Sequence, residues 1–357
     1  MKALKLCKFI KTMIKPLLFC KEDNNNEYLK VLDQRLLPTK EKYLICKDYK
    51  EIIDAIAGMA LRGAPLIGIA GAWACYFADK EIKKEEALIK AFNEIVEARP
   101  TAVNLKTCVE RMHQVYIEEI NKENTSLALL EEAKQIAKED QDMCNEMAVH
   151  GVKALKEYYS TTKKSFKLLT HCNTGALATG GIGTALGVIT KLAEKETVEV
   201  YATETRPYLQ GARLTCWELA KNNIHTTLLP DSAVPYLMKN KQIDAVFVGA
   251  DRIVKNGDTA NKIGTYMLAL AAKENNLPFY VVAPSTSFDN ETNSGADIVI
   301  EERSPEELKV INGKQMAPEE VHTFNPAFDI TPNNLITAFI TEKGCFSNAK
   351  SSLVSSL

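Results

Sequence analysis

The chain lacks the patterns that mark several large classes of protein. Its nine cysteines contain no CxxC pair, so the sequence predicts neither a disulfide framework nor a zinc cluster, and this usage fits a reducing cytoplasm. The five histidines show no ligand spacing, which predicts no metal site. The formal net charge is only −2, so the chain has no overall attraction to nucleic acid or to an anionic membrane. No apolar run is long enough to span a membrane.

The remaining composition is that of an ordinary water-soluble protein. The chain has 357 residues, 46% hydrophobic and 25% charged, which is enough for about two domains. Its start is unusual, because the first 21 residues carry six lysines and no acidic residue. These lysines interrupt the apolar residues so often that no secretory signal is predicted. We therefore expect residues 1–25 to form a basic N-terminal extension, either solvated or leading into a strand.

Residues 26–160 are predicted to form a mostly helical domain. A partial strand pattern stops at Pro38, so a small sheet is expected to begin there. Helical spacing follows over residues 49–61, and a helix of small residues resumes after an arginine-bearing loop. Further helices are expected over residues 81–98 and, as a pair, over residues 109–160.

Residues 161–357 show a different pattern, which predicts a parallel sheet. Short apolar runs alternate with helical segments, as in βαβ units with right-handed crossovers. A hinge between the two domains is expected near Gly151 and residues 160–164. The five clearest runs are residues 166–170, 198–202, 224–229, 243–249 and 278–283, and weaker strand candidates lie at residues 296–300 and near Val321.

The first of these runs ends at a polar corner that carries Cys172. Ligands of open α/β sheets bind at the carboxyl ends of strands, so chemistry is expected here. A helix is predicted over the glycine-rich stretch that follows, and its dipole would favour the thiolate of Cys172. The alternative is a buried, inert cysteine. Gly181 and Gly183 come too late after the strand for a dinucleotide-binding turn, and no lysine completes a P-loop.

Asp251 follows another apolar run, in the sequence AVFVGADRI. It either caps a helix or pairs with Arg252, or it is a partly desolvated acid or base. His171 lies beside Cys172 and is a candidate activator of the thiol. Neighbours on a strand point to opposite faces, however, so a structural role for His171 fits equally well.

Several loops combine cations with glycine or proline in a way that suits phosphate and sugar binding. Arginine matches phosphate oxygens with two parallel hydrogen bonds, and glycine lets backbone N–H groups approach an anion. Each loop alone is more often a surface ion pair, but four such loops, two of them Arg-Pro corners, favour a shared binding role. The four loops are Arg62-Gly63-Ala64-Pro65, Arg99-Pro100-Thr101, residues 206–213 with Gln210, and Asn261-Lys262.

Taken together, these motifs resemble those of the methylthioribose-1-phosphate isomerase family. Its superfamily includes ribose-1,5-bisphosphate isomerases and the regulatory subunits of the initiation-factor guanine-nucleotide exchange factor. The resemblance implies an α/β protein with a mostly helical N-terminal domain, a Rossmann-like parallel-sheet domain, and a homodimer. The matching stretches, between Leu32 and Pro332, are LDQRLLP, RGAPLIGIAGA, RPTAVNL, THCNTGALAT, ATETRPYLQGARLT, VGADRIVKNGDTANKIGT and FNPAFDITP.

The resemblance also implies the roles of individual residues. Cys172 and Asp251 correspond to the catalytic positions of the family. The first dozen residues fall outside the family pattern, and Met13 is a possible alternative start. The implied substrate-binding residues are Arg62, Gly63, Ala64, Arg99, Gln210, Asn261 and Lys262.

The implied reaction converts 5-methylthioribose 1-phosphate into 5-methylthioribulose 1-phosphate in methionine salvage. It is internally redox-neutral and needs no cofactor. Asp251, if protonated, would assist ring opening, and C2 hydrogen would move either as a proton taken by Cys172 or as a hydride. Two alternatives stay open: a sister isomerase acting on 5-deoxyribose 1-phosphate or ribose 1,5-bisphosphate, and a non-catalytic regulatory subunit. Such a subunit would not be expected to retain both Cys172 and Asp251.

Overall fold

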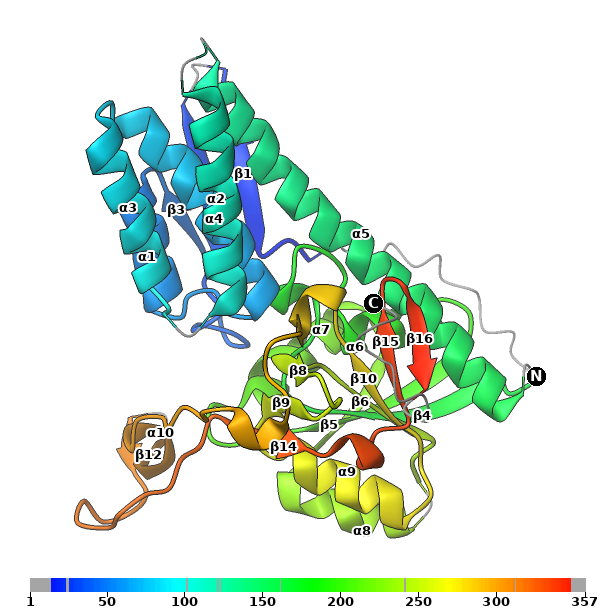
Figure 1. The fold of residues 1–357 in the computed structure, drawn as a ribbon. Coiled ribbons are helices and arrows are strands. Elements are labelled where there is room, and N and C mark those ends of the chain that lie inside the picture. Colours follow the sequence, from blue (N-terminus) through cyan, green and yellow to red (C-terminus); the bar gives the residue numbers. More distant parts are fainter. Residues whose placement is uncertain are drawn as a thin grey trace.

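The computed structural model describes residues 14–347, apart from residues 24–25, 101, 121, 123, 161, 241 and 312. Most of the lysine-rich start, including Met13, lies outside the described residues. The chain forms an N-terminal helical part and a C-terminal sheet part, as expected from the sequence (Figure 1). Among the described residues, no helix is long and apolar enough to cross a membrane.

The N-terminal part combines a small antiparallel sheet with helices. The sheet has the order β1 (Leu17–Lys21), β2 (Glu27–Leu32), β3 (Tyr43–Cys46). Strand β1 lies within the predicted extension over residues 1–25 and pairs along its whole length with β2, so this part of the extension leads into a strand. The helices are α1 (Tyr49–Ala57), α2 (Ala64–Glu81), α3 (Glu85–Glu97), α4 (Val103–Glu119) and α5 (Thr125–Tyr159).

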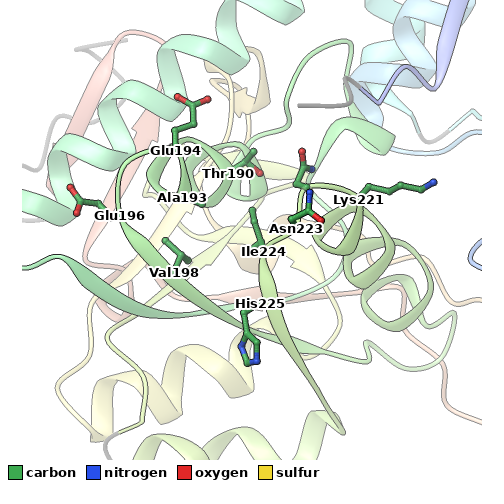
Figure 2. A pocket seen from close by; sticks show the side chains of 10 residues that line it. Thr190, Ala193, Glu194, Glu196, Val198, Lys221, Asn223, Ile224 and His225 are labelled. Atoms are coloured by element: carbon green, nitrogen blue, oxygen red, sulfur yellow. The ribbon is translucent and has the colours of Figure 1, made fainter. Parts of the chain in front are cut away.

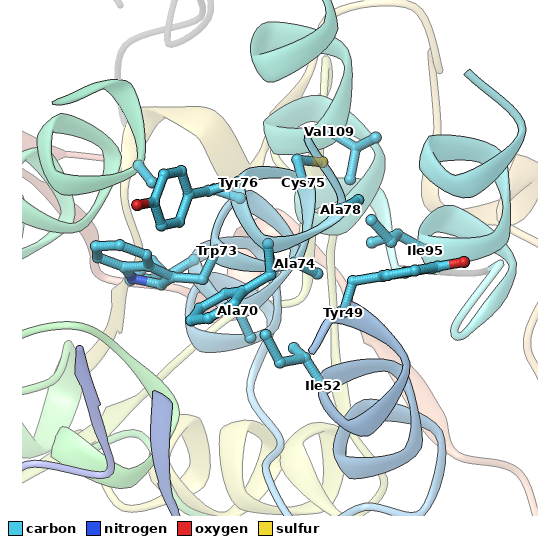
Figure 3. Packing of buried hydrophobic residues seen from close by; sticks show 14 of the residues in the cluster. Tyr49, Ile52, Ala70, Trp73, Ala74, Cys75, Tyr76, Ala78, Ile95 and Val109 are labelled. Carbon is cyan, nitrogen blue, oxygen red and sulfur yellow. The ribbon is translucent and has the colours of Figure 1, made fainter. Parts of the chain in front are cut away.

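Helix α2 is the centre of the N-terminal core. Its small residues allow other elements to pack closely around it, so that every residue from Leu66 to Asp79 is buried. Figure 3 shows Trp73, Tyr76 and Cys75 of α2 among side chains from α1, α3 and α4. An apolar helix without a polar face is stable only when it is surrounded in this way.

The C-terminal part contains a seven-stranded sheet in the order β16-β15-β10-β7-β4-β5-β6. All of its pairings are parallel except that of β15 with β16. The five clear strand predictions are confirmed, whereas those at residues 296–300 and near Val321 are wrong, since the first region holds a 3₁₀ turn (Gly295–Asp297) and the second no strand. The strands are β4 (Ser165–Thr170), β5 (Thr197–Thr203), β6 (His225–Leu229), β7 (Ala245–Val248), β10 (Phe279–Val282), β15 (Ala338–Thr341) and β16 (Gly344–Ser347).

Helices cover both faces of this sheet. One core cluster joins α6 (Ala185–Ala193) and the second half of α5 to one face, and the other joins α8 (Val234–Lys239) and α9 (Thr265–Glu274) to the opposite face. A further helix, α7 (Cys216–Lys221), precedes the edge strand β6. Layers of helix, sheet and helix are the expected solution for a mostly parallel sheet.

Helix α5 connects the two parts without a break. Leu129 and Ile136 of its first half belong to the N-terminal core, whereas Met147 and Leu155 belong to the core of the sheet. Gly151 lies inside this helix, where a Cβ atom would come within 2.5 Å of the Val188 side chain. The expectation of a hinge at Gly151 is therefore wrong, because the glycine permits close packing.

A second, four-stranded sheet and an arm complete the chain. The sheet has the order β11 (Phe288–Asp289), β8 (Arg252–Val254), β9 (Thr259–Lys262), β14 (Phe328–Thr331). The arm, which extends from the body in Figure 1, carries α10 (Glu306–Lys309), β12 (Val310–Ile311) and β13 (Lys314–Gln315).

Candidate active site

Cys172 lies just beyond the carboxyl end of β4, in a backbone conformation that few residues adopt. Its φ is +62°, in the left-handed region, which costs a residue other than glycine about 1–3 kcal/mol. Two hydrogen bonds hold this conformation: the backbone N–H donates to Thr205 Oγ1 at 2.9 Å, and the carbonyl accepts from Thr215 Oγ1 at 2.5 Å. The surrounding fold thus fixes the position of a buried thiol.

The helix expected directly after Cys172 is not there. Residues 175–184 are irregular apart from the short 3₁₀ turn Ala176–Ala178, and α6 begins only at Ala185. The prediction of a dipole-stabilised thiolate is therefore wrong. Burial raises the pKa of Cys172, although the charges of Arg62 and Lys262 act in the opposite direction. The free protein accordingly holds Cys172 as a thiol at neutral pH.

His171 has a structural role in this geometry. Its ring is buried, with Nε2 2.8 Å from the carbonyl oxygen of Ile263 and Nδ1 2.6 Å from Thr203 Oγ1. Because a carbonyl only accepts, Nε2 carries the proton and Nδ1 accepts from the threonine. Burial lowers the pKa of His171, which favours this neutral form. With both nitrogens occupied, the ring is not free to take a proton from Cys172.

Arg62 is held against the corner by its neighbour Asn173. The Arg62 Nη2 group donates to the backbone oxygen of Asn173 at 2.7 Å and also to its side-chain Oδ1. Asn173 Nδ2 in turn donates to Glu218 Oε1 at 2.7 Å. The Nε atom of Arg62 is buried and has no hydrogen-bond partner among the described residues. One donor of this guanidinium therefore remains for a ligand.

Glu218 is the buried residue beneath this corner, and the sequence analysis missed it. Its carboxylate accepts hydrogen bonds from the backbone N–H groups of Ala176 at 2.7 Å and Leu177 at 3.2 Å, in addition to Asn173. Burial raises the pKa of Glu218, and these hydrogen bonds oppose that shift. No local pattern marks Glu218, because every partner lies more than 40 positions earlier in the chain.

Gly63 and Ala64 bring the N-terminal part to the same corner. Gly63 has φ +97°, and a Cβ atom there would lie 2.5 Å from the backbone of Ala178. Only glycine permits this approach. Helix α2 begins at Ala64, and no side chain caps its first N–H groups. The start of this helix is therefore suited to bind an anion.

Asp251 follows β7 and is surrounded by positive charge. Arg252 pairs with Asp289 instead, and no hydrogen bond or ion pair reaches the Asp251 carboxylate within the part of the chain that the structure describes. Its surface is accessible to water, yet the surrounding protein raises its pKa by desolvation. The charges of Lys262, Arg62 and Arg99 oppose the shift without cancelling it.

The other predicted binding residues differ in how the structure connects them to the Asp251 carboxylate. Arg99 is half-buried and contacts Met59 Sδ at 3.7 Å, and Lys262 Nζ lies 5.1 Å from the centre of the Phe328 ring. Asn261 Nδ2 donates to Thr265 Oγ1 at 3.0 Å. Gln210 is buried, and its Oε1 lacks a partner among the described residues. No charge or hydrogen bond ties Gln210 and Asn261 to Asp251 in the described structure, so their roles remain predictions.

Two arginines of the loop at residues 206–213 serve the fold. Arg206 donates to the carbonyl oxygens of Glu307 and Leu308, and Arg213 donates to that of Gln34 at 2.9 Å. Both side chains are thus occupied by backbone acceptors in distant segments. Of the polar residues expected to bind substrate in this loop, only Gln210 then remains a candidate.

Two cavities of the described structure lie away from Cys172 and Asp251, although Ala176 and Glu218 line one of them. One, of about 410 Å³, opens between the starts of β5 and β6, where Figure 2 shows Glu196, Val198 and His225 around it. The other, of about 530 Å³, lies between β1, α2 and the glycine-rich stretch. Neither is lined by Cys172 or Asp251. Among the described residues, no cluster of side chains could hold a metal ion.

Comparison with known proteins places this geometry in context. Residues 60–348 match the model of the initiation factor 2 subunit family. A methylthioribose-1-phosphate isomerase from Caldicellulosiruptor saccharolyticus is 47% identical over 326 residues, covering 89% of this chain and 93% of the relative.

Two solved structures are also similar. The crystal structure of 5-methylthioribose 1-phosphate isomerase from Pyrococcus horikoshii OT3 has a TM-score of 0.85 and 36% identity, and the match covers 96% of this chain and 95% of that one. The crystal structure of translation initiation factor eIF-2B, subunit delta, from A. fulgidus has a TM-score of 0.81 and 39% identity, with coverage of 94% and 96%.

Proposed function

The chain belongs to the initiation factor 2 subunit family, and from this premise we propose that it is an isomerase that converts 5-methylthioribose 1-phosphate to 5-methylthioribulose 1-phosphate. The family contains proteins named as isomerases and proteins named as translation initiation factors. The main observation in favour of an enzyme is the Asp251 carboxyl group. Its pKa is raised, three cations lie near it, and it is within electrostatic reach of Cys172. A pKa perturbed in this way marks a candidate catalytic acid.

The charge balance suits a phosphosugar. Arg62, Arg99 and Lys262 have no carboxylate partner among the described ion pairs and hydrogen bonds. Cations left unpaired inside a protein are costly unless an anion completes the site. A sugar phosphate carries about two negative charges near neutral pH. We infer that its phosphate binds among these three side chains and the start of α2.

Asp251 can act first as an acid and then as a base. As the acid it gives its proton to the ring oxygen while the bond between that oxygen and C1 breaks. Hydrogen then moves with its electron pair from C2 to C1, and the Asp251 carboxylate takes the proton of the C2 hydroxyl group. The phosphate stays on C1, and the proton count of the protein returns to its starting value.

Of the two routes for C2 hydrogen, the hydride shift needs no thiolate. The raised pKa of Cys172 therefore favours it over proton abstraction by sulfur. In this route the buried thiol lines the reacting carbons and excludes water from the intermediate. A product that loses C2 deuterium to solvent would contradict the hydride route.

We further propose a cytoplasmic homodimer. Support for the dimer comes from the family resemblance, and support for the compartment comes from cysteines that form no disulfide among the described residues. Sedimentation of the purified protein tests the dimer, and a single monomeric species would refute it.

The central experiment is turnover of 5-methylthioribose 1-phosphate by the purified protein, beside 5-deoxyribose 1-phosphate and ribose 1,5-bisphosphate. Turnover of the methylthio sugar that is lost in Cys172→Ala and Asp251→Asn supports the proposal. Preference for another sugar would assign a sister isomerase with the same chemistry. Folded protein without turnover of any of the three would favour the regulatory subunit.

A further inference from the structure

Arg303 meets a proposed phosphate-binding residue across the boundary between the two parts of the chain. Its Nη2 group lies 3.8 Å from the sulfur of Met59, and Arg99 Nη1 approaches the same sulfur at 3.7 Å. Met59 itself lies in the loop that leads to Arg62. The positive charge of Arg303 contributes to lowering the pKa of Arg99, after burial, which shows that the two guanidinium groups are within electrostatic reach.

Arg303 differs from Arg99 in that it holds two carboxylates. It donates to Glu307 Oε1 from Nη2 at 2.6 Å and from Nε at 3.2 Å, and Nη1 donates to Glu301 Oε1 at 3.1 Å. The three side chains are only 17–33% exposed. Arg99 has no carboxylate partner among the described ion pairs. Burial lowers the pKa of Arg99, and the charge of Glu301 opposes that shift.

The backbone around Arg303 is fixed. The Arg303 N–H donates to the carbonyl oxygen of Asn325 at 2.8 Å, and Arg206 Nη2 donates to that of Leu308 at 3.3 Å. The base of the arm is therefore tied to the loop that carries Gln210, while the Arg303 side chain reaches the loop that carries Arg62. Arg303 thereby holds Glu301 and Glu307 in a defined arrangement.

We propose that Arg303 is a positioning residue that holds Glu301 and Glu307 away from Arg99, so that Arg99 stays free for the substrate phosphate. Without Arg303, the two glutamates would lose their cationic partner, and the charge of Glu301 already acts on Arg99. An ion pair with Arg99 would then form and compete with the phosphate. The hydrogen bonds that Arg303 donates go to the two glutamates and Met59, so Arg303 is not itself assigned to the phosphate. This inference rests on the proposed function, because that function supplies the phosphate that Arg99 would bind.

The test is a set of charge-neutralising variants assayed with 5-methylthioribose 1-phosphate and with inorganic phosphate as a competing anion. We expect Arg303→Gln to raise KM and the inhibition constant of phosphate by about tenfold, and to change kcat by less than about twofold. Adding Glu301→Gln and Glu307→Gln to this variant should restore both constants to within about threefold of the wild type. A merely structural role, or direct contact of Arg303 with the phosphate, would not be rescued in this way.

Arg111→Gln is the matched control. Arg111 also pairs with two glutamates, Glu132 and Glu139, but its charge is not among those that shift the pKa of Asp251 or Arg99. The KM of Arg111→Gln should equal that of the wild type. If Arg303→Gln fails to fold, Arg303→Lys keeps the charge but not the paired hydrogen bonds to Glu307. Its KM should rise by less than about tenfold and return toward the wild-type value when Glu301→Gln and Glu307→Gln are added.

The outcomes separate the two proposals. Wild-type protein that neither turns over the sugar nor binds phosphate would overturn the proposed function. Active wild-type protein with an unchanged KM in Arg303→Gln, or with a raised KM that the added glutamine substitutions fail to restore, would overturn the role of Arg303 alone.

Discussion

Replacing Glu218 by glutamine should loosen the corner that holds Cys172 and Arg62. The carboxylate accepts three hydrogen bonds, from Asn173 Nδ2 and from the N–H groups of Ala176 and Leu177. A glutamine side chain has one acceptor oxygen, and its NH₂ group would face at least one of these donors. A buried donor left without a partner costs about 1–3 kcal/mol, so we expect the free energy of unfolding to fall by about 2 kcal/mol.

The effect on activity follows from the same contacts. Asn173 binds Glu218 through its amide nitrogen and Arg62 through its two oxygen atoms, so displacement of Asn173 moves the guanidinium. A misplacement of about 1 Å at such a group lowers kcat/KM by about 100-fold. Unfolding in urea and steady-state kinetics measure the two effects on the same preparation.

Glu196→Gln is the control for Glu218→Gln. The Glu196 side chain is only 3% exposed and pairs with Lys156 and Lys164. It directly precedes β5, so it lies at the amino ends of the strands, whereas Cys172 lies at their carboxyl ends. This variant should lose stability while keeping kcat/KM. Wild-type stability in Glu218→Gln, or lost stability with full activity, would refute the reasoning.

Three further predictions concern single positions. The folded-state pKa of Asp140 is raised by burial to about 6 from an ordinary 3.8, so the folded form binds more protons between these values. The stability that Asp140 contributes is therefore present below about pH 4 and lost as the pH rises through 6. In Asp140→Asn, the free energy of unfolding in urea should depend less on pH over this range, and an unchanged pH dependence would contradict the prediction. Gly63→Ala should cost about 2–4 kcal/mol in the same assay, because its Cβ would overlap Ala178 and its φ is +97°; near-wild-type stability would mean that the loop yields. Asp251→Asn should lower kcat by about 10²–10⁴-fold with little change in unfolding, and retained activity would remove Asp251 from the mechanism.

Some functional residues are visible in the sequence because their signal is local. Cys172 and Asp251 each follow an apolar run that forms a buried strand, β4 or β7. A short apolar run and the break after it are readable within about ten residues. The same holds for the loop between α1 and α2, where Arg62 and Gly63 interrupt two helical patterns.

Other features escape sequence reasoning because they depend on distant contacts. The glycine-rich stretch after Cys172 has small residues that fit a helix, but Asp140 Oδ2 accepts from the N–H of Gly180 and Glu218 accepts from that of Ala176. These carboxylates satisfy backbone groups that a helix would otherwise pair internally. The irregular conformation of residues 175–184 is thus set by side chains from α5 and α7.

The sequence by itself determined the mixed α/β class, the five clearest strands of the parallel sheet and the edge of the sheet at which chemistry is expected. These depend on hydrophobic periodicity and on breaks in it, which are properties of neighbouring residues. Only the tertiary structure decided the protonation of Cys172 and His171, the buried role of Glu218 and the meeting of Arg303 with Arg99. Burial and charge act through space, so these properties depend on residues that the fold brings together from far apart in the chain.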